Sequence, residues 1–93
     1  MDRSELILKI VKKYVMDKYP MVEDVTITQG VERANSEYYD KPFLVYYTFH
    51  IIFPINRFTH PIYHTIYNEI ISIKPYIFDR NEFIRGTQYH IDD

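Results

Sequence analysis

The sequence has no cysteine, no tryptophan and only two glycines among its 93 residues. Without cysteine, the chain has neither a disulfide framework nor a thiolate metal or redox site. Two glycines, Gly30 and Gly86, are too few for a phosphate-binding P-loop or a dinucleotide fingerprint. The Gly-x-Ser-x-Gly motif of serine hydrolases is missing as well. These absences favour a protein that is not an enzyme and that binds no cofactor.

Long apolar runs are also missing. No segment approaches the roughly 18 apolar residues of a membrane span, and the short apolar stretch near the N-terminus has no cleavage site of the kind that follows a signal peptide. We therefore expect a cytoplasmic protein, located in the host cytoplasm if its source is viral.

Aromatic residues, by contrast, are abundant: the chain has ten tyrosines and six phenylalanines, beside many isoleucines. These residues have AT-rich codons, which favours a genome such as that of a phage or mobile element. They also suit pleated, half-buried surfaces. The formal net charge of −2 argues against non-specific binding to DNA.

Hydrophobic periodicity predicts five elements in one small α+β domain over residues 1–93. A helix is expected over 4–18, capped by Asp2 or Ser4 and ended by Pro20. Its apolar stripe consists of Leu6, Ile7, Ile10, Val11, Tyr14 and Val15. A strand over 22–31 and a polar loop over 32–41 follow.

The later elements are a strand over 43–53, a helix from Thr59 or His60 to about Ile73, and a tail after Pro75. Pro75 is expected to end the second helix. In the tail, residues 76–78 form a short strand or a connection, and 83–91 join the sheet. The predicted fold is thus helix-strand-strand-helix-strand, with a mainly antiparallel sheet and two helices packed on one face.

The strand over 43–53 carries the functional prediction. Its odd-numbered residues are all apolar, whereas its even-numbered residues mix apolar and polar types. Two helices cover only one face of a sheet, so the mixed face needs another cover. We therefore expect a self-associating or otherwise protein-binding protein. The expected interface residues are Tyr46, Thr48, His50 and Ile52, with Tyr38 and Tyr39 as a rim.

Two alternatives remain open. The first is a single-stranded nucleic-acid-binding module, in which the aromatic strand stacks bases beside Lys9, Lys12 and Lys13, with Tyr46 as a contact. The element order is similar to that of type II KH domains, but the Gly-x-x-Gly clamp of that family is absent. The second is an inhibitor that docks on a host enzyme, which predicts a chain that is monomeric alone.

The histidines offer few ligand sets. His60 and His64 lie four residues apart at a helix start, but Pro61 replaces the glutamate of the metalloprotease motif. His50 is expected to bond to its sheet neighbours, and His90 to lie near Asp92 and Asp93. The sequence predicts no metal and no small-molecule ligand.

Overall fold

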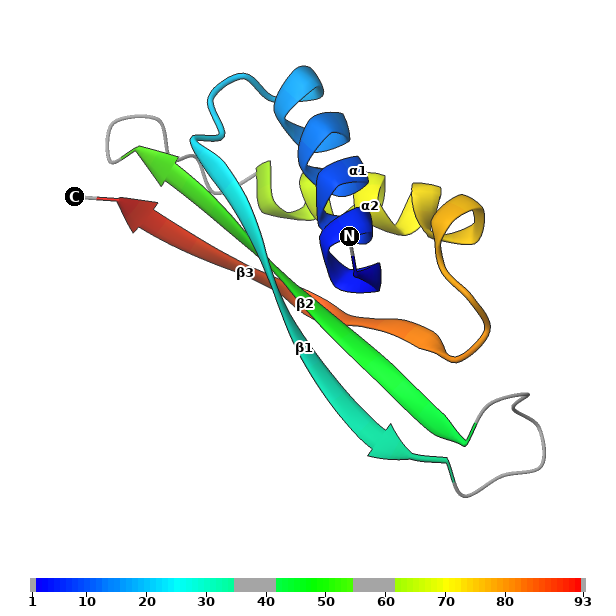
Figure 1. The fold of residues 1–93 in the computed structure, drawn as a ribbon. Coiled ribbons are helices and arrows are strands. Elements are labelled where there is room, and N and C mark those ends of the chain that lie inside the picture. The colour runs from blue at the N-terminus through cyan, green and yellow to red at the C-terminus, as the bar shows by residue number, and fades with distance from the viewer. Residues whose placement is uncertain (1, 35–41, 55–61, 93) are drawn as a thin grey trace.

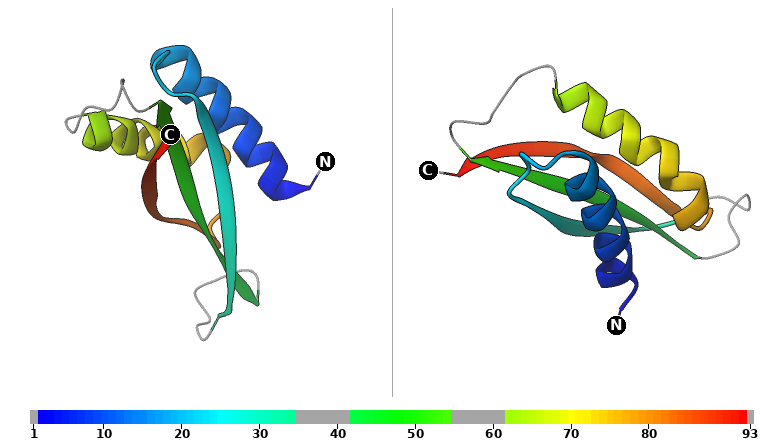
Figure 2. Two further views of the ribbon diagram at one scale, coloured as in Figure 1. Left: turned by 90° about the vertical axis from the view of Figure 1, so that its left-hand side faces the viewer. Right: turned by 90° about the horizontal axis from the view of Figure 1, so that it is seen from above.

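The computed structural model describes residues 2–34, 42–54 and 62–92 (Figure 1). The elements follow the predicted order. They are α1 (Arg3–Lys18), β1 (Asp24–Arg33), β2 (Phe43–Pro54), α2 (Ile62–Ile77) and β3 (Glu82–Asp92). Both helices lie on the same side of the three-stranded sheet (Figures 1 and 2). The predicted α+β class and the packing of the helices against the sheet are confirmed.

The sheet is mixed rather than mainly antiparallel, which corrects the prediction. β2 is the central strand and pairs antiparallel with β1, whereas β3 pairs parallel with β2. The helix between β2 and β3 explains the difference. A helical crossover returns the chain to the end of the sheet where the previous strand began, so the next strand runs parallel to it.

Helix α1 begins as its sequence predicts. The carboxylate of Asp2 accepts a hydrogen bond of 2.8 Å from the backbone amide of Glu5, which caps the first turn. The predicted apolar stripe is wider than the surface that α1 buries. Of the stripe residues, only Ile7, Val11 and Val15 are buried. Leu6 is 41% exposed and Ile10 is 40% exposed.

Helix α2 continues past Pro75 to Ile77, so the prediction that Pro75 ends the helix is wrong. A proline in the last turn removes only one intrahelical bond, and the amide of Phe78 still bonds the Lys74 carbonyl at 2.9 Å. Residues 76 and 77 are therefore helical and form no short strand. The tail contributes a single strand, β3.

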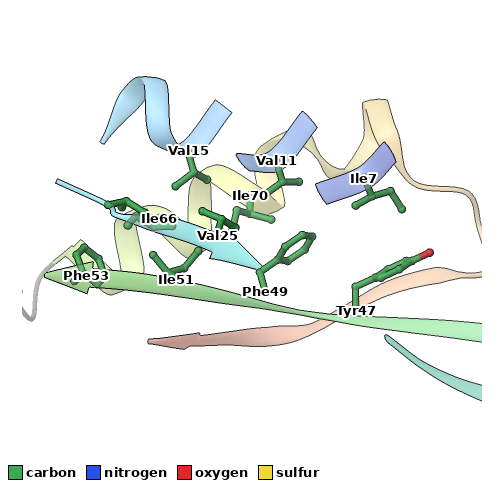
Figure 3. Close-up of a cluster of buried hydrophobic side chains, with 11 residues drawn as sticks. Ile7, Val11, Val15, Val25, Tyr47, Phe49, Ile51, Phe53, Ile66 and Ile70 are labelled. Carbon is green, nitrogen blue, oxygen red and sulfur yellow. The ribbon is translucent and has the colours of Figure 1, made fainter. Parts of the chain in front are cut away.

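The core lies between the helices and the odd-numbered residues of β2 (Figure 3). Tyr47, Phe49, Ile51 and Phe53 are at most 1% exposed. Burying a side chain of this size contributes about 1.5–3 kcal/mol. The helical side chains that meet them are Ile7, Val11 and Val15 of α1 and Ile66 and Ile70 of α2.

A buried carboxylate joins α1 to β3. Glu82 is 4% exposed, and its oxygens accept hydrogen bonds from Arg3 Nη2 at 2.6 Å, the Asp79 amide at 2.7 Å and the Tyr47 hydroxyl at 3.0 Å. Burial alone would raise the pKa of Glu82, but the bonds from Arg3, Asp79 and Tyr47 outweigh it and lower the pKa below its usual value. We call Glu82 and these three donors the Glu82 cluster.

Candidate interaction surface on the open face of the sheet

The even-numbered residues of β2 point away from the helices, because successive side chains of a strand alternate between faces. We call this side of the sheet the open face. Its β2 residues are all half-buried, and no described element lies over them (Figures 1 and 2). They are Leu44, Tyr46, Thr48, His50 and Ile52.

Two aromatic rings stack at one end of the open face. Tyr46 of β2 and Phe83 of β3 have ring centroids 5.4 Å apart and an interplanar angle of 28°. The Arg85 guanidinium lies 5.2 Å from the Tyr46 centroid, and Lys74 Nζ lies 5.4 Å from that of Phe83. Arg85 also contacts Glu32 of β1 at 3.4 Å. This end therefore joins an aromatic pair to two cations and one carboxylate.

Two histidines meet in the middle of the open face. Nδ1 of His50 lies 2.9 Å from Nε2 of His90, and Nε2 of His50 lies 3.0 Å from Oγ1 of Thr28. Burial, together with the nearby His90 ring, lowers the pKa of His50. A hydrogen bond between two imidazole nitrogens needs one donor and one acceptor. The pair therefore holds its geometry when at least one ring is neutral.

The described end of the β1–β2 pair, at Arg33 and Phe43, extends beyond β3, which first pairs with β2 at Val45. We call residues 31–33 and 43–44 the arm. Val31 is 54% exposed and Phe43 51% exposed on the helix side, where the helices no longer cover the strands. The radius of gyration, 14.2 Å, exceeds the roughly 12 Å of a compact chain of this length.

The structure brings the predicted β2 residues Tyr46, Thr48, His50 and Ile52 onto one face. Tyr38 and Tyr39, the predicted rim, lie outside the described residues, as do the predicted helix start at 59–61 and His60.

The predicted nucleic-acid contacts do not come together. Lys9, Lys12 and Lys13 lie on α1, on the other side of the sheet from Tyr46. Lys12 pairs with Asp24 at 2.8 Å and Lys13 with Asp17 at 2.9 Å.

Residues of β1 and β3 complete the open face, and the sequence prediction missed four of them: Thr28, Phe83, Arg85 and His90. The register of β3 explains the omission of Phe83, Arg85 and His90. β3 shifts register between Tyr47 and Thr48 of β2, so Arg85 is an extra residue without a partner in the register. This bulge breaks the alternation along β3. The one available signal was the imperfect alternation of residues 83–91.

The chain matches no protein-family model, no curated protein and no solved structure. No helix in residues 2–34, 42–54 and 62–92 is long and apolar enough to cross a bilayer. Over the same ranges, no three His, Asp or Glu side chains gather as a metal cluster. The functional proposals below therefore depend on the geometry of the open face.

Proposed function

We propose that this protein is a non-catalytic assembly module that self-associates through the open face of its sheet. One observation carries the proposal. Half-buried apolar and aromatic side chains of β2 (Leu44, Tyr46 and Ile52) face away from the helices, and no described helix or strand lies over them (Figure 2). Tyrosine suits such an interface because it buries a large area and keeps a polar tip.

A second copy of the chain fits this face by charge. Its exposed ion pair consists of one anion, Glu32, and one cation, Arg85. In a two-fold arrangement the same patch meets itself, so an axis that passes beside this pair would place Arg85 of one copy opposite Glu32 of the other. A partner whose surface carries charges of one sign would instead place a like charge beside either Glu32 or Arg85.

The arm also favours a second copy of the chain as the partner. It is a two-stranded ribbon, and an isolated ribbon of this kind is only marginally stable in water. It nevertheless exposes Val31 and Phe43 on one face and carries Leu44 on the other. Packing of a second copy on the open face would remove Leu44 from water and stabilise the ribbon, whereas Val31 and Phe43, on the helix side, lie outside that contact.

Solution mass tests the proposal. Sedimentation equilibrium of the wild type should show a concentration-dependent oligomer, and Tyr46→Ala combined with Ile52→Asp should give a folded monomer. Ile10→Asp is the matched control, because it places the same charge on the exposed helix side and should leave the oligomer intact. A wild type that stays monomeric at every concentration would overturn the proposal. So would a double variant that unfolds, because the open face would then be internal core.

A second function is favoured by the Tyr46–Phe83 stack, because single-strand binders place aromatic rings on a sheet and cations beside them. Here Arg85 and Lys74 supply the cations. Fluorescence titration with a short single strand would then show affinity that falls steeply with salt. Phe83→Ala should weaken it and Lys9→Ala, on the other side of the sheet, should not. No binding at low salt would end this alternative.

A further inference from the structure

The facing nitrogens of His50 and His90 have a use beyond hydrogen bonding. We propose that the two imidazoles form a binding site for one late first-row transition-metal ion, such as Zn²⁺ or Cu²⁺. The site consists of side chains from two adjacent strands of one chain, so the proposal does not depend on self-association.

The separation of the nitrogens fits a shared ion. Bonds of roughly 2.0–2.1 Å at angles of about 90–110° place two cis ligand atoms about 2.9–3.4 Å apart. Nδ1 of His50 and Nε2 of His90 are 2.9 Å apart, at the short end of that range. The nitrogens now face one another, and rotation about the soft second side-chain torsion of each ring turns both lone pairs toward a common point.

Thr28 prepares His50 for this role. When Nε2–H of His50 donates to the Thr28 hydroxyl, Nδ1 carries the lone pair that faces His90. Outer hydrogen bonds of this kind fix the tautomer and orientation of metal-bound histidines.

The proton count balances, with water exchanging the proton that leaves Nε2 of His90 for one taken up at its Nδ1. In the neutral pair each ring holds one proton, and Nε2–H of His90 donates to Nδ1 of His50. When the ion binds, His90 carries its proton on Nδ1 instead, and its Nε2 lone pair joins that of His50. The ion thus replaces the shared hydrogen bond, and the total proton count of the two rings is unchanged.

The surroundings admit a cation. His90 is exposed and borders a shallow hollow that Glu23, Asp24 and Ile52 also line. Asp24 is paired with Lys12, and both carboxylates still contribute to the local potential. Among the described residues no third His, Asp or Glu joins the pair, so water completes the coordination. We expect an exchangeable ion rather than a structural one.

Calorimetric titration of the purified chain with ZnCl₂ and CuCl₂ at pH 7.5 tests the site. We expect one ion per chain, with Cu²⁺ bound more tightly than Zn²⁺. His50→Gln and His90→Gln should each weaken Zn²⁺ binding at least tenfold. Thr28→Val, which keeps both ligands, should weaken it by about tenfold or more. His64→Gln is the control, because His64 is exposed on α2, away from the open face.

Ring resonances provide a measurement that needs no variant. Paramagnetic Cu²⁺ should broaden the signals of His50 and His90 before that of His64. The proposal is overturned if neither ion binds at millimolar concentration, if His50→Gln and His90→Gln bind as the wild type does, or if His64 broadens first.

Discussion

Strand β2 carries a polar cluster on each of its faces, and the two clusters differ in how their hydrogen bonds are satisfied. On the helix side, the carboxylate of Glu82 is 4% exposed and accepts bonds from Arg3, Tyr47 and the Asp79 amide. On the open face, His50 bonds to Thr28 and His90 while remaining half-exposed.

The difference follows from solvation. A charge out of water is tolerated only when its lone pairs are fully bonded, so the Glu82 cluster fixes the positions of α1 and β3. A half-exposed imidazole can exchange its partner for water, an ion or another chain at little cost. We therefore expect the helix side to determine stability, and we propose binding only for the open face. Five predictions test that division, from the largest expected effect to the smallest.

The largest effect is expected from Phe49→Ala. Phe49 is 0% exposed and belongs to the same buried cluster as core side chains of both helices, so its truncation should lower the free energy of unfolding by about 3–5 kcal/mol. Urea denaturation followed by circular dichroism measures the change. Thr26→Ala, an exposed substitution on the open side of β1, should change it by about 0.5 kcal/mol or less. Similar losses in the two variants would contradict the division between the faces.

The second effect is expected from Arg3→Met, which leaves the Glu82 carboxylate buried without its cation. Breaking a fully buried pair costs about 3–5 kcal/mol. Because the Arg3 side chain is 41% exposed, we expect a smaller loss, about 2–3 kcal/mol. Lys13→Met breaks the exposed Lys13–Asp17 pair and should cost about 0.5 kcal/mol or less. If urea denaturation shows that the two variants lose equal free energy of unfolding, the Glu82 cluster does not fix the positions of α1 and β3.

The third effect is a dependence on acid. Because the pKa of Glu82 is lowered in the folded chain, its stabilisation is complete above the pKa of the unfolded state, near 4.5. That stabilisation is lost as the pH falls through the lowered folded value. Glu82→Gln should be less stable than the wild type at pH 7, and the gap should narrow below about pH 4.5. Asp2, Asp24 and Glu69 also have lowered pKa values, but they remain in both proteins and cancel in the difference.

The Glu82 cluster also predicts a loss of stability at high pH, through Tyr47. Burial, followed by the bond to Glu82, raises the pKa of Tyr47 to about 12. Tyr47 stabilises the fold while it is neutral, so this contribution persists below pH 10 and is lost as the pH approaches 12. In ultraviolet titration, the Tyr47→Phe variant should lack the latest-ionising tyrosine.

The sequence predicted the elements better than their pairing. Local signals narrowed the cap to Asp2 or Ser4, of which the structure has Asp2, and placed the alternation of β2 correctly, because both depend on residues within a few positions of each other. The parallel pairing of β3 and its bulge at Arg85 depend on contacts between distant segments, and no local pattern encodes them.

The candidate site shows the same limit. Residues within β2 were predicted as a group because alternation along one strand puts them on one face. Their partners Phe83 and His90 follow only from the register between β2 and β3. The Glu82 cluster was not predicted at all, since residues 3 and 82 lie at opposite ends of the chain.

The smallest effect on stability is expected from His50→Gln. It removes hydrogen bonds from a half-exposed group, which water can replace, so the free energy of unfolding should fall by about 0.5–1 kcal/mol. Tyr47→Phe is the matched deletion on the other face of β2. It removes a bond to a buried carboxylate and should cost about 1.5–3 kcal/mol. If His50→Gln costs as much as Tyr47→Phe, the histidine pair holds the fold together, and its conformation is not free to change when a ligand binds.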